Sequence, residues 1–156
     1  MNEIKLMKRF LASVKMGSKI VRNLERKTKS LEIRKLWVDI LNNFAVHENS
    51  LIEVMEDIGV GTNVDLSLMQ KMAICMQKVK LCGNDDVELL LFGIEGMEMG
   101  MVGVFKFIHV NQQINEDFII EAVSIYDEYE RSLNRLLKKV KEILEFDALR
   151  EKNKTE

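Results

Sequence analysis

Residues 116–149 read EDFIIEAVSIYDEYERSLNRLLKKVKEILEFDAL. Apolar or aromatic side chains recur every three or four residues in this stretch, at Ile119, Ala122, Tyr126, Tyr129, Leu133, Leu136, Val140 and Ile143. This spacing places them along one face of a helix, whereas a half-buried strand would alternate every second residue. The stretch lacks proline, as does the whole chain, and proline inside a helix costs roughly 3 kcal/mol. It therefore predicts one long amphipathic helix.

Three more long stretches repeat this spacing, and a shorter one lies between them. Residues 3–27 carry a stripe of Met7, Phe10, Val14, Gly17, Val21 and Leu24. The second long stretch follows a break at residues 28–30 and runs to Ile58, with Trp37, Ile40, Phe44, His47, Leu51, Val54 and Ile58 aligned. A shorter helix is predicted over residues 66–81. Residues 87–110 are apolar almost all round, so we expect that helix to be the most deeply buried.

The lengths of the links predict how these helices connect. Short links join the first long helix to the second and the third to the fourth, so each pair should be antiparallel. The long link that contains the short helix lets the chain return along the body, so the second and third long helices should be parallel. The sequence thus predicts an all-α four-helix bundle with one long crossover. We expect residues 1–149 to form one domain and residues 150–156 a polar tail that frays.

Composition excludes several classes of protein. Hydrophobic residues make up 47% of the 156-residue chain, which is too many for a disordered protein. Two cysteines are too few for a disulfide scaffold. No apolar run approaches the roughly 20 residues that cross a bilayer, and the beginning of the sequence has no signal-peptide pattern. These features predict a soluble, cytoplasmic protein.

Charge is segregated along the chain. Residues 1–35 carry eleven basic against three acidic side chains, and residues 36–130 carry four basic against seventeen acidic ones. Solvated helix faces or an anion-binding surface would both explain this asymmetry. In the predicted topology the basic ends of the first and fourth long helices lie together, bringing Arg22, Arg26, Lys27 and Lys29 toward Arg135, Lys138, Lys139 and Lys141. We expect an acidic protein surface as the partner there, and neither nucleic acid nor a membrane.

The residues of a metal-dependent oxidase are only partly present. A di-iron bundle needs a Glu from each of two helices and a Glu-x-x-His from each of the other two. His47 stands on the core stripe, but Phe44 replaces the Glu three residues earlier, and the fourth long helix offers Tyr126 and Tyr129 without a histidine. We expect Phe44 and Tyr129 to fill the space of the ligands, and no enzymatic activity. Glu98 is expected inside the bundle, hydrogen-bonded to His47 or to a tyrosine hydroxyl.

Three short motifs resemble a known family. They are MGSKIVRNLE at residues 16–25, His47-Glu48, and GIEGMEMG at residues 93–100. Together they are similar to the small ferritin-like bacterial four-helix-bundle proteins of unassigned function, and the similarity covers nearly the whole chain. It implies a ferritin-like fold and possible metal ligands at His47, Glu95 and Glu98. Iron or manganese would be the metal, although the departures at Gly17, Phe44 and Tyr129 favour a protein without a cofactor.

Glycines recur on one side of the third long helix. Gly93, Gly96, Gly100 and Gly103 are spaced three, four and three residues apart. Each costs about 0.8–1.0 kcal/mol in a helix relative to alanine, so close approach of another helix should offset them. That helix belongs either to the same chain or to a second copy in a homodimer. We therefore expect a non-catalytic bundle that acts through protein–protein contact or self-association, with metal binding as the alternative.

Overall fold

The computed structural model describes residues 3–63, 66–81, 83, 85–110 and 113–155. These residues form five helices and no strand: α1 (Glu3–Lys27), α2 (Leu31–Asp57), α3 (Leu66–Leu81), α4 (Asp86–Val110) and α5 (Glu116–Thr155). The prediction of an all-helical fold is therefore confirmed. None of the described helices is both long and apolar enough to cross a membrane.

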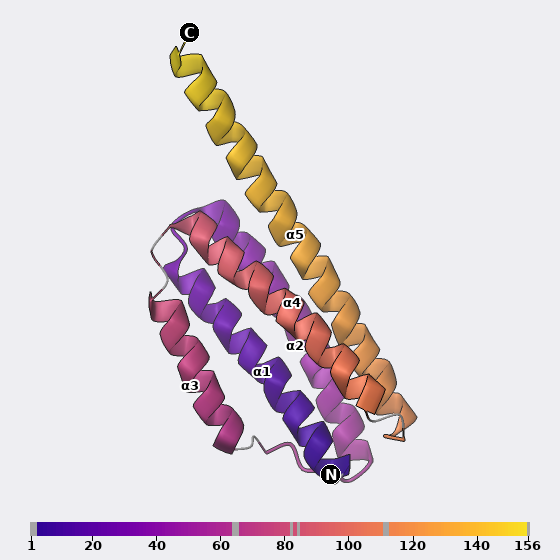
Figure 1. Cartoon of the computed structure of the whole chain (residues 1–156). Helices are drawn as coiled ribbons and strands as arrows, with labels where there is room; N and C mark the ends of the chain where they lie inside the picture. Colours follow the sequence, from indigo (N-terminus) through magenta and orange to yellow (C-terminus); the bar gives the residue numbers. More distant parts are fainter. Residues whose placement is uncertain (1–2, 64–65, 82, 84, 111–112, 156) are drawn as a thin grey trace.

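The four long helices lie side by side (Figure 1). Along this body α1 and α5 run in one direction and α2 and α4 in the other. α5 packs against α4 and α2, while α1 packs against α2, α4 and the shorter α3. Because α3 lies outside α1, it covers one flank of the body and leaves the outer side of α4 open.

Hydrogen bonds hold the link between α1 and α2 against the start of α4. The Asp86 carboxylate accepts hydrogen bonds from the backbone N–H groups of Lys29, at 2.8 Å, and Ser30, at 2.9 Å. Ser30 caps α2, since its side chain accepts a hydrogen bond from the N–H of Ile33. Thr28 donates its hydroxyl to the Leu24 carbonyl and accepts a hydrogen bond from the indole N–H of Trp37. The first residue of α4 thus fixes the turn that reverses the chain.

The core contains the predicted stripes of the long helices. Trp37 is fully buried and lies against Gly93 of α4. Most stripe residues are buried with it, including Met7, Phe10, Val14, Val21, Leu24, Ile40, Phe44, Leu51, Ala122, Tyr129, Leu136 and Val140. Burying a large apolar side chain is worth roughly 1.5–3 kcal/mol, so these contacts stabilise the packing of α1, α2, α4 and α5.

Two expectations about the helices are wrong. Residues 150–155 are not a separate tail, because α5 continues as a helix to Thr155 and extends beyond the ends of its neighbours (Figure 1). α4 is not the most deeply buried helix, because α3 packs against α1 instead of covering α4. The outer side of α4 therefore leaves large apolar side chains in water, namely Leu91, Met99, Val102, Phe105 and Val110.

Candidate functional site

Tyr129 of α5 fills the middle of the body. Its ring centroid lies 4.9 Å from that of Phe44 on α2. A Cβ added to Gly100 of α4 would lie 2.5 Å from its Cε1 atom, and a Cβ added to Gly17 of α1 would lie 3.4 Å from its hydroxyl oxygen. The two glycines therefore leave room for the tyrosine ring. As expected from the sequence, Phe44 and Tyr129 lie together inside the body.

Burial changes the acidity of this tyrosine. Only 7% of Tyr129 is exposed, so water cannot solvate its phenolate. Desolvation raises the pKa of Tyr129 from 10.0 to about 12. The hydroxyl stays protonated at neutral pH, and the residue acts as a large packing group.

His47 faces Glu128 of α5. Its Nε2 atom lies 3.6 Å from Oε2 of Glu128. The Glu128 carboxylate is buried and accepts hydrogen bonds from Arg131, from Nε at 3.0 Å and from Nη2 at 2.6 Å. These hydrogen bonds and the carboxylate charge raise the pKa of Arg131. Since an isolated buried charge is costly, Arg131 provides the partner that the carboxylate needs.

The predicted metal ligands are not brought together. His47 is half-buried, whereas Glu95 and Glu98 are exposed on α4. The expectation that Glu98 lies inside the bundle is wrong, because α4 turns that side chain outward and Glu128 is the buried acid. Within the described ranges, no group of three His, Cys, Asp or Glu side chains is placed to hold a metal ion. His47, Glu95 and Glu98 thus do not fit a shared iron or manganese site.

The sequence did not predict the burial of Glu128, because this residue is not part of the apolar stripe that contains Tyr129. Glu128 lies next to Tyr129, so its burial depends on how far α5 is rotated against α2. The sequence does indicate a partner for Glu128. Arg131 follows it by three residues, and side chains at this spacing can pair on a helix.

The four predicted interface glycines divide into two pairs. Gly93 packs inside the chain, where an added Cβ would lie 2.5 Å from Cη2 of Trp37, and Gly100 packs against Tyr129. Gly96 and Gly103 are exposed, and an added Cβ would meet nothing within 4 Å at either position. One pair thus allows close packing within the chain, and the other lies on the open side of α4.

Exposed apolar side chains also lie on the outer side of α4. We define the outer face of α4 as Leu91, Gly96, Met99, Val102, Gly103, Phe105 and Val110. Met99 is 75% exposed and Phe105 56% exposed, which is unusual for such large apolar groups. The exposed charged residues Glu95, Glu98 and Lys106 lie among them on the same helix.

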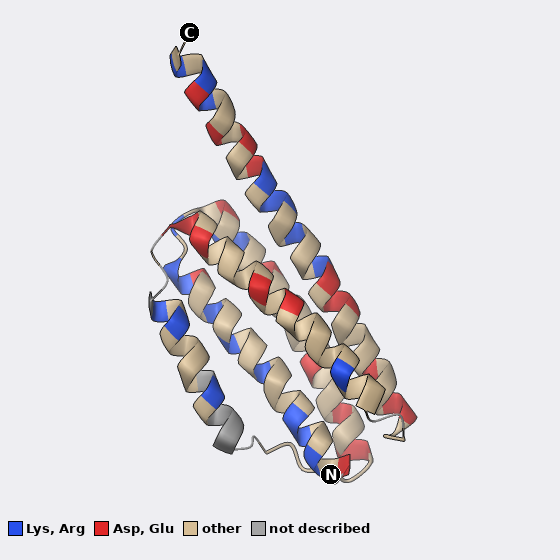
Figure 2. Cartoon of the chain, in the orientation of Figure 1, with Lys and Arg blue, Asp and Glu red and all other residues tan. Residues whose placement is uncertain are grey.

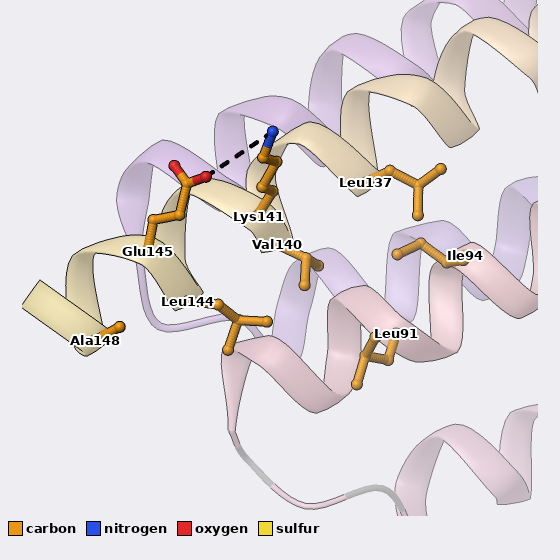
Figure 3. A pocket seen from close by; sticks show the side chains of 8 residues that line it. All are labelled: Leu91, Ile94, Leu137, Val140, Lys141, Leu144, Glu145 and Ala148. Carbon is orange, nitrogen blue, oxygen red and sulfur yellow. Dashed lines mark ion pairs between the residues drawn. The ribbon is translucent and has the colours of Figure 1, made fainter.

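An apolar groove continues this surface onto α5. The groove between the beginning of α4 and the second half of α5 is lined by Leu91, Ile94, Leu137, Val140, Lys141, Leu144, Glu145 and Ala148 (Figure 3). Leu91 belongs both to the groove and to the outer face of α4. The groove and the outer face therefore adjoin each other at Leu91.

Basic residues are frequent along α1 and α3 (Figure 2). The end of α1 contacts α3, because Lys27 donates a hydrogen bond from Nζ to the Val79 carbonyl at 2.8 Å. On α5, Lys139 forms ion pairs with Glu32 of α2 and with Glu142. The two predicted basic ends thus have different neighbours, since α1 adjoins α3 while α5 adjoins α2 and α4.

The chain matches no family model, and comparisons with curated proteins and with solved structures also found no match. The resemblance to ferritin-like proteins therefore remains a prediction from the motifs. The arrangement of the described side chains provides the grounds for a functional proposal.

The difference between the packed and the exposed glycines of α4 can be tested by alanine substitution. We expect Gly96→Ala to raise the free energy of unfolding by about 0.8–1.0 kcal/mol, because alanine favours the helix and the added methyl group meets open space. Gly100→Ala should lower it by about 1 kcal/mol, since overpacking against the Tyr129 ring outweighs the same helical gain. Urea unfolding at a protein concentration at which the unmodified chain is monomeric measures both. Equal effects of the two substitutions would contradict this packing.

Burial of Tyr129 predicts a loss of stability at alkaline pH. Between pH 10 and about 12 the tyrosine ionises in the unfolded chain but not in the folded one. The unfolded state then binds fewer protons, so stability falls as pH rises, by about 3 kcal/mol in total for a difference of two pKa units.

The matched variants for this pH test are Tyr129→Phe and Tyr126→Phe. Tyr129→Phe should remove this part of the alkaline loss, whereas Tyr126→Phe should retain it because Tyr129 is still present. Unfolding free energies from pH 9 to 12 provide the measurement. The same slope in Tyr129→Phe and in the unmodified protein would refute the prediction.

Proposed function

We propose that this chain is a non-catalytic, ferritin-like four-helix bundle that acts through protein–protein contact, and that a second copy of the chain is its first partner. The contact surface is the outer face of α4 together with the groove on α5. The observation that carries this proposal is the set of large apolar side chains that α4 and the groove leave in water.

The interior supports a contact role over a catalytic one. In a di-iron bundle, carboxylates and histidines from all four helices point inward at the centre. Here Tyr129, Phe44, Gly17 and Gly100 meet at the centre, and the buried Glu128 is held by Arg131. Aromatic packing and a satisfied ion pair stabilise a fold but provide no reactive group. This arrangement favours contact over metal binding at His47, Glu95 and Glu98.

The exposed surface supports self-association energetically. Met99, Val102 and Phe105 are each at least half exposed, so covering them would remove considerable apolar area from water. Gly96 and Gly103 would allow a helix of the second copy to approach closely, as small residues do between packed helices. Met99 adds a flexible side chain that adapts to an opposing surface.

A second contact is supported by charge. α1 carries eight basic and two acidic residues, and α3 carries three lysines and no acid. These two helices pack together, so their basic side chains form one positively charged flank (Figure 2). An acidic protein surface is the partner that this flank would attract, and the attraction would weaken with salt.

A lysine substitution on α4 tests the self-association. The variant Leu91→Lys should shift the protein from twice the chain mass to the chain mass, because it places a charge where the outer face of α4 meets the groove. Leu91 is exposed in the chain itself, so the fold of the variant should persist. Light scattering over a range of protein concentrations measures the mass, and circular dichroism confirms the helices.

Val46→Lys is the matched control. Val46 is 64% exposed on α2, away from the outer face of α4, so this variant should associate like the unmodified protein. A chain mass for the unmodified protein at every concentration would contradict self-association. Equal dissociation by Val46→Lys would show that the outer face of α4 is not the contact.

A further inference from the structure

We infer that the groove between α4 and α5 receives the last part of α5, residues 141–155, from a second copy of this chain. In this pairing the two α5 helices are antiparallel about a two-fold axis near residue 146. The inference rests on the proposed self-association and specifies which segment of the second copy occupies the groove.

The length of α5 is the first argument. α5 contains 40 residues and α4 contains 25, so at about 1.5 Å per residue α5 extends far past its neighbour. Val140 is its last buried residue, and Figure 1 shows the rest of α5 projecting from the body. An isolated helix of this length is marginal in water. A covering partner would explain why the segment carries Leu144 at more than half exposure.

The sequence of this segment suits an antiparallel pair. One stripe of α5 consists of Leu137, Lys141, Leu144, Ala148, Glu151 and Thr155, spaced four, three, four, three and four residues apart. These spacings keep the residues on one side of the helix. The pattern reads the same in both directions about residue 146. A two-fold axis at that point would therefore place the stripe of one copy directly along the stripe of the other.

The groove fits this occupant in shape. Leu137, Lys141, Leu144 and Ala148 of the stripe line the groove, together with Leu91 and Ile94 of α4 (Figure 3). In the antiparallel pairing Leu144 faces Ala148 of the second copy, so a large side chain meets a small one. The end of the second α5 then covers Leu91 and Leu137, which are both nearly half exposed in the single chain.

One repeated pair of opposite charges supports this register. Lys141 faces Glu151 of the second copy, and the two-fold axis repeats this pair. Within one chain both side chains are at least 70% exposed, and their ion-pair neighbours Glu145 and Lys154 each lie 3.9 Å away on the same helix. Such exposed pairs are weak, so both residues can turn to a partner. Lys152 and Lys154 of the second copy would also approach the part of α4 that carries the exposed Glu95.

Charge reversal tests the register. Lys141→Glu places two like-charged Glu–Glu pairs in its own dimer, and Glu151→Lys places two Lys–Lys pairs in its own. We expect each variant alone to dimerise about tenfold more weakly than the unmodified protein at low salt, since two exposed ion pairs are lost. An equimolar mixture of the two variants should regain the original affinity, because their heterodimer contains two opposite-charge pairs. Sedimentation equilibrium measures the three dissociation constants.

The control variant is Arg150→Glu, which reverses a charge in the same segment on the opposite side of α5 from the stripe. It should dimerise like the unmodified protein. Dimerisation of the unmodified protein without any effect of Lys141→Glu or Glu151→Lys would overturn this pairing and leave the proposed self-association intact. Failure of the mixture to recover would also exclude the second α5 as the occupant. A monomeric unmodified protein would overturn both proposals.

Discussion

The packing of the Tyr129 ring is the contact on which the rest of the body depends. The ring lies between α2, where it contacts Phe44, and α4, where Gly100 has no side chain that could displace it. Gly17 of α1 leaves space for its hydroxyl. Three helices thus adapt to a single side chain of α5. Because the space is filled by an aromatic ring, ionisable groups are moved to the edge of the core, where Glu128 pairs with Arg131.

The surface, unlike this filled interior, exposes apolar side chains. α3 packs beside α1, so the outer side of α4 faces water, and α5 continues past the end of α4. Both features expose apolar side chains that a monomer would be expected to bury. A second copy would cover the ones that line the groove with apolar contacts like those of the core. The glycines of α4 also differ in their surroundings. Gly93 and Gly100 allow close contacts within the chain, whereas Gly96 and Gly103 have no neighbouring atoms at the position of a Cβ.

Local signals in the sequence predict much of this fold. The helices over residues 3–27 and 66–81 were predicted with the bounds that the structure shows, because apolar spacing and polar links define their ends. The rotation and position of one helix relative to another do not depend on the local sequence alone. The outward turn of Glu98, the burial of Glu128 and the open side of α4 all depend on where α3 and α5 pack. The helical end of α5 was missed because its polar composition alone favours fraying.

Amide hydrogen exchange of residues 141–155 tests the central claim most directly. In one chain this segment projects from the body, so its amides should exchange almost as fast as those of an unfolded peptide. If a second copy covers the segment, exchange should be slow at high protein concentration and become fast on dilution. The account predicts this dependence on concentration. Fast exchange of residues 141–155 at every concentration would contradict it.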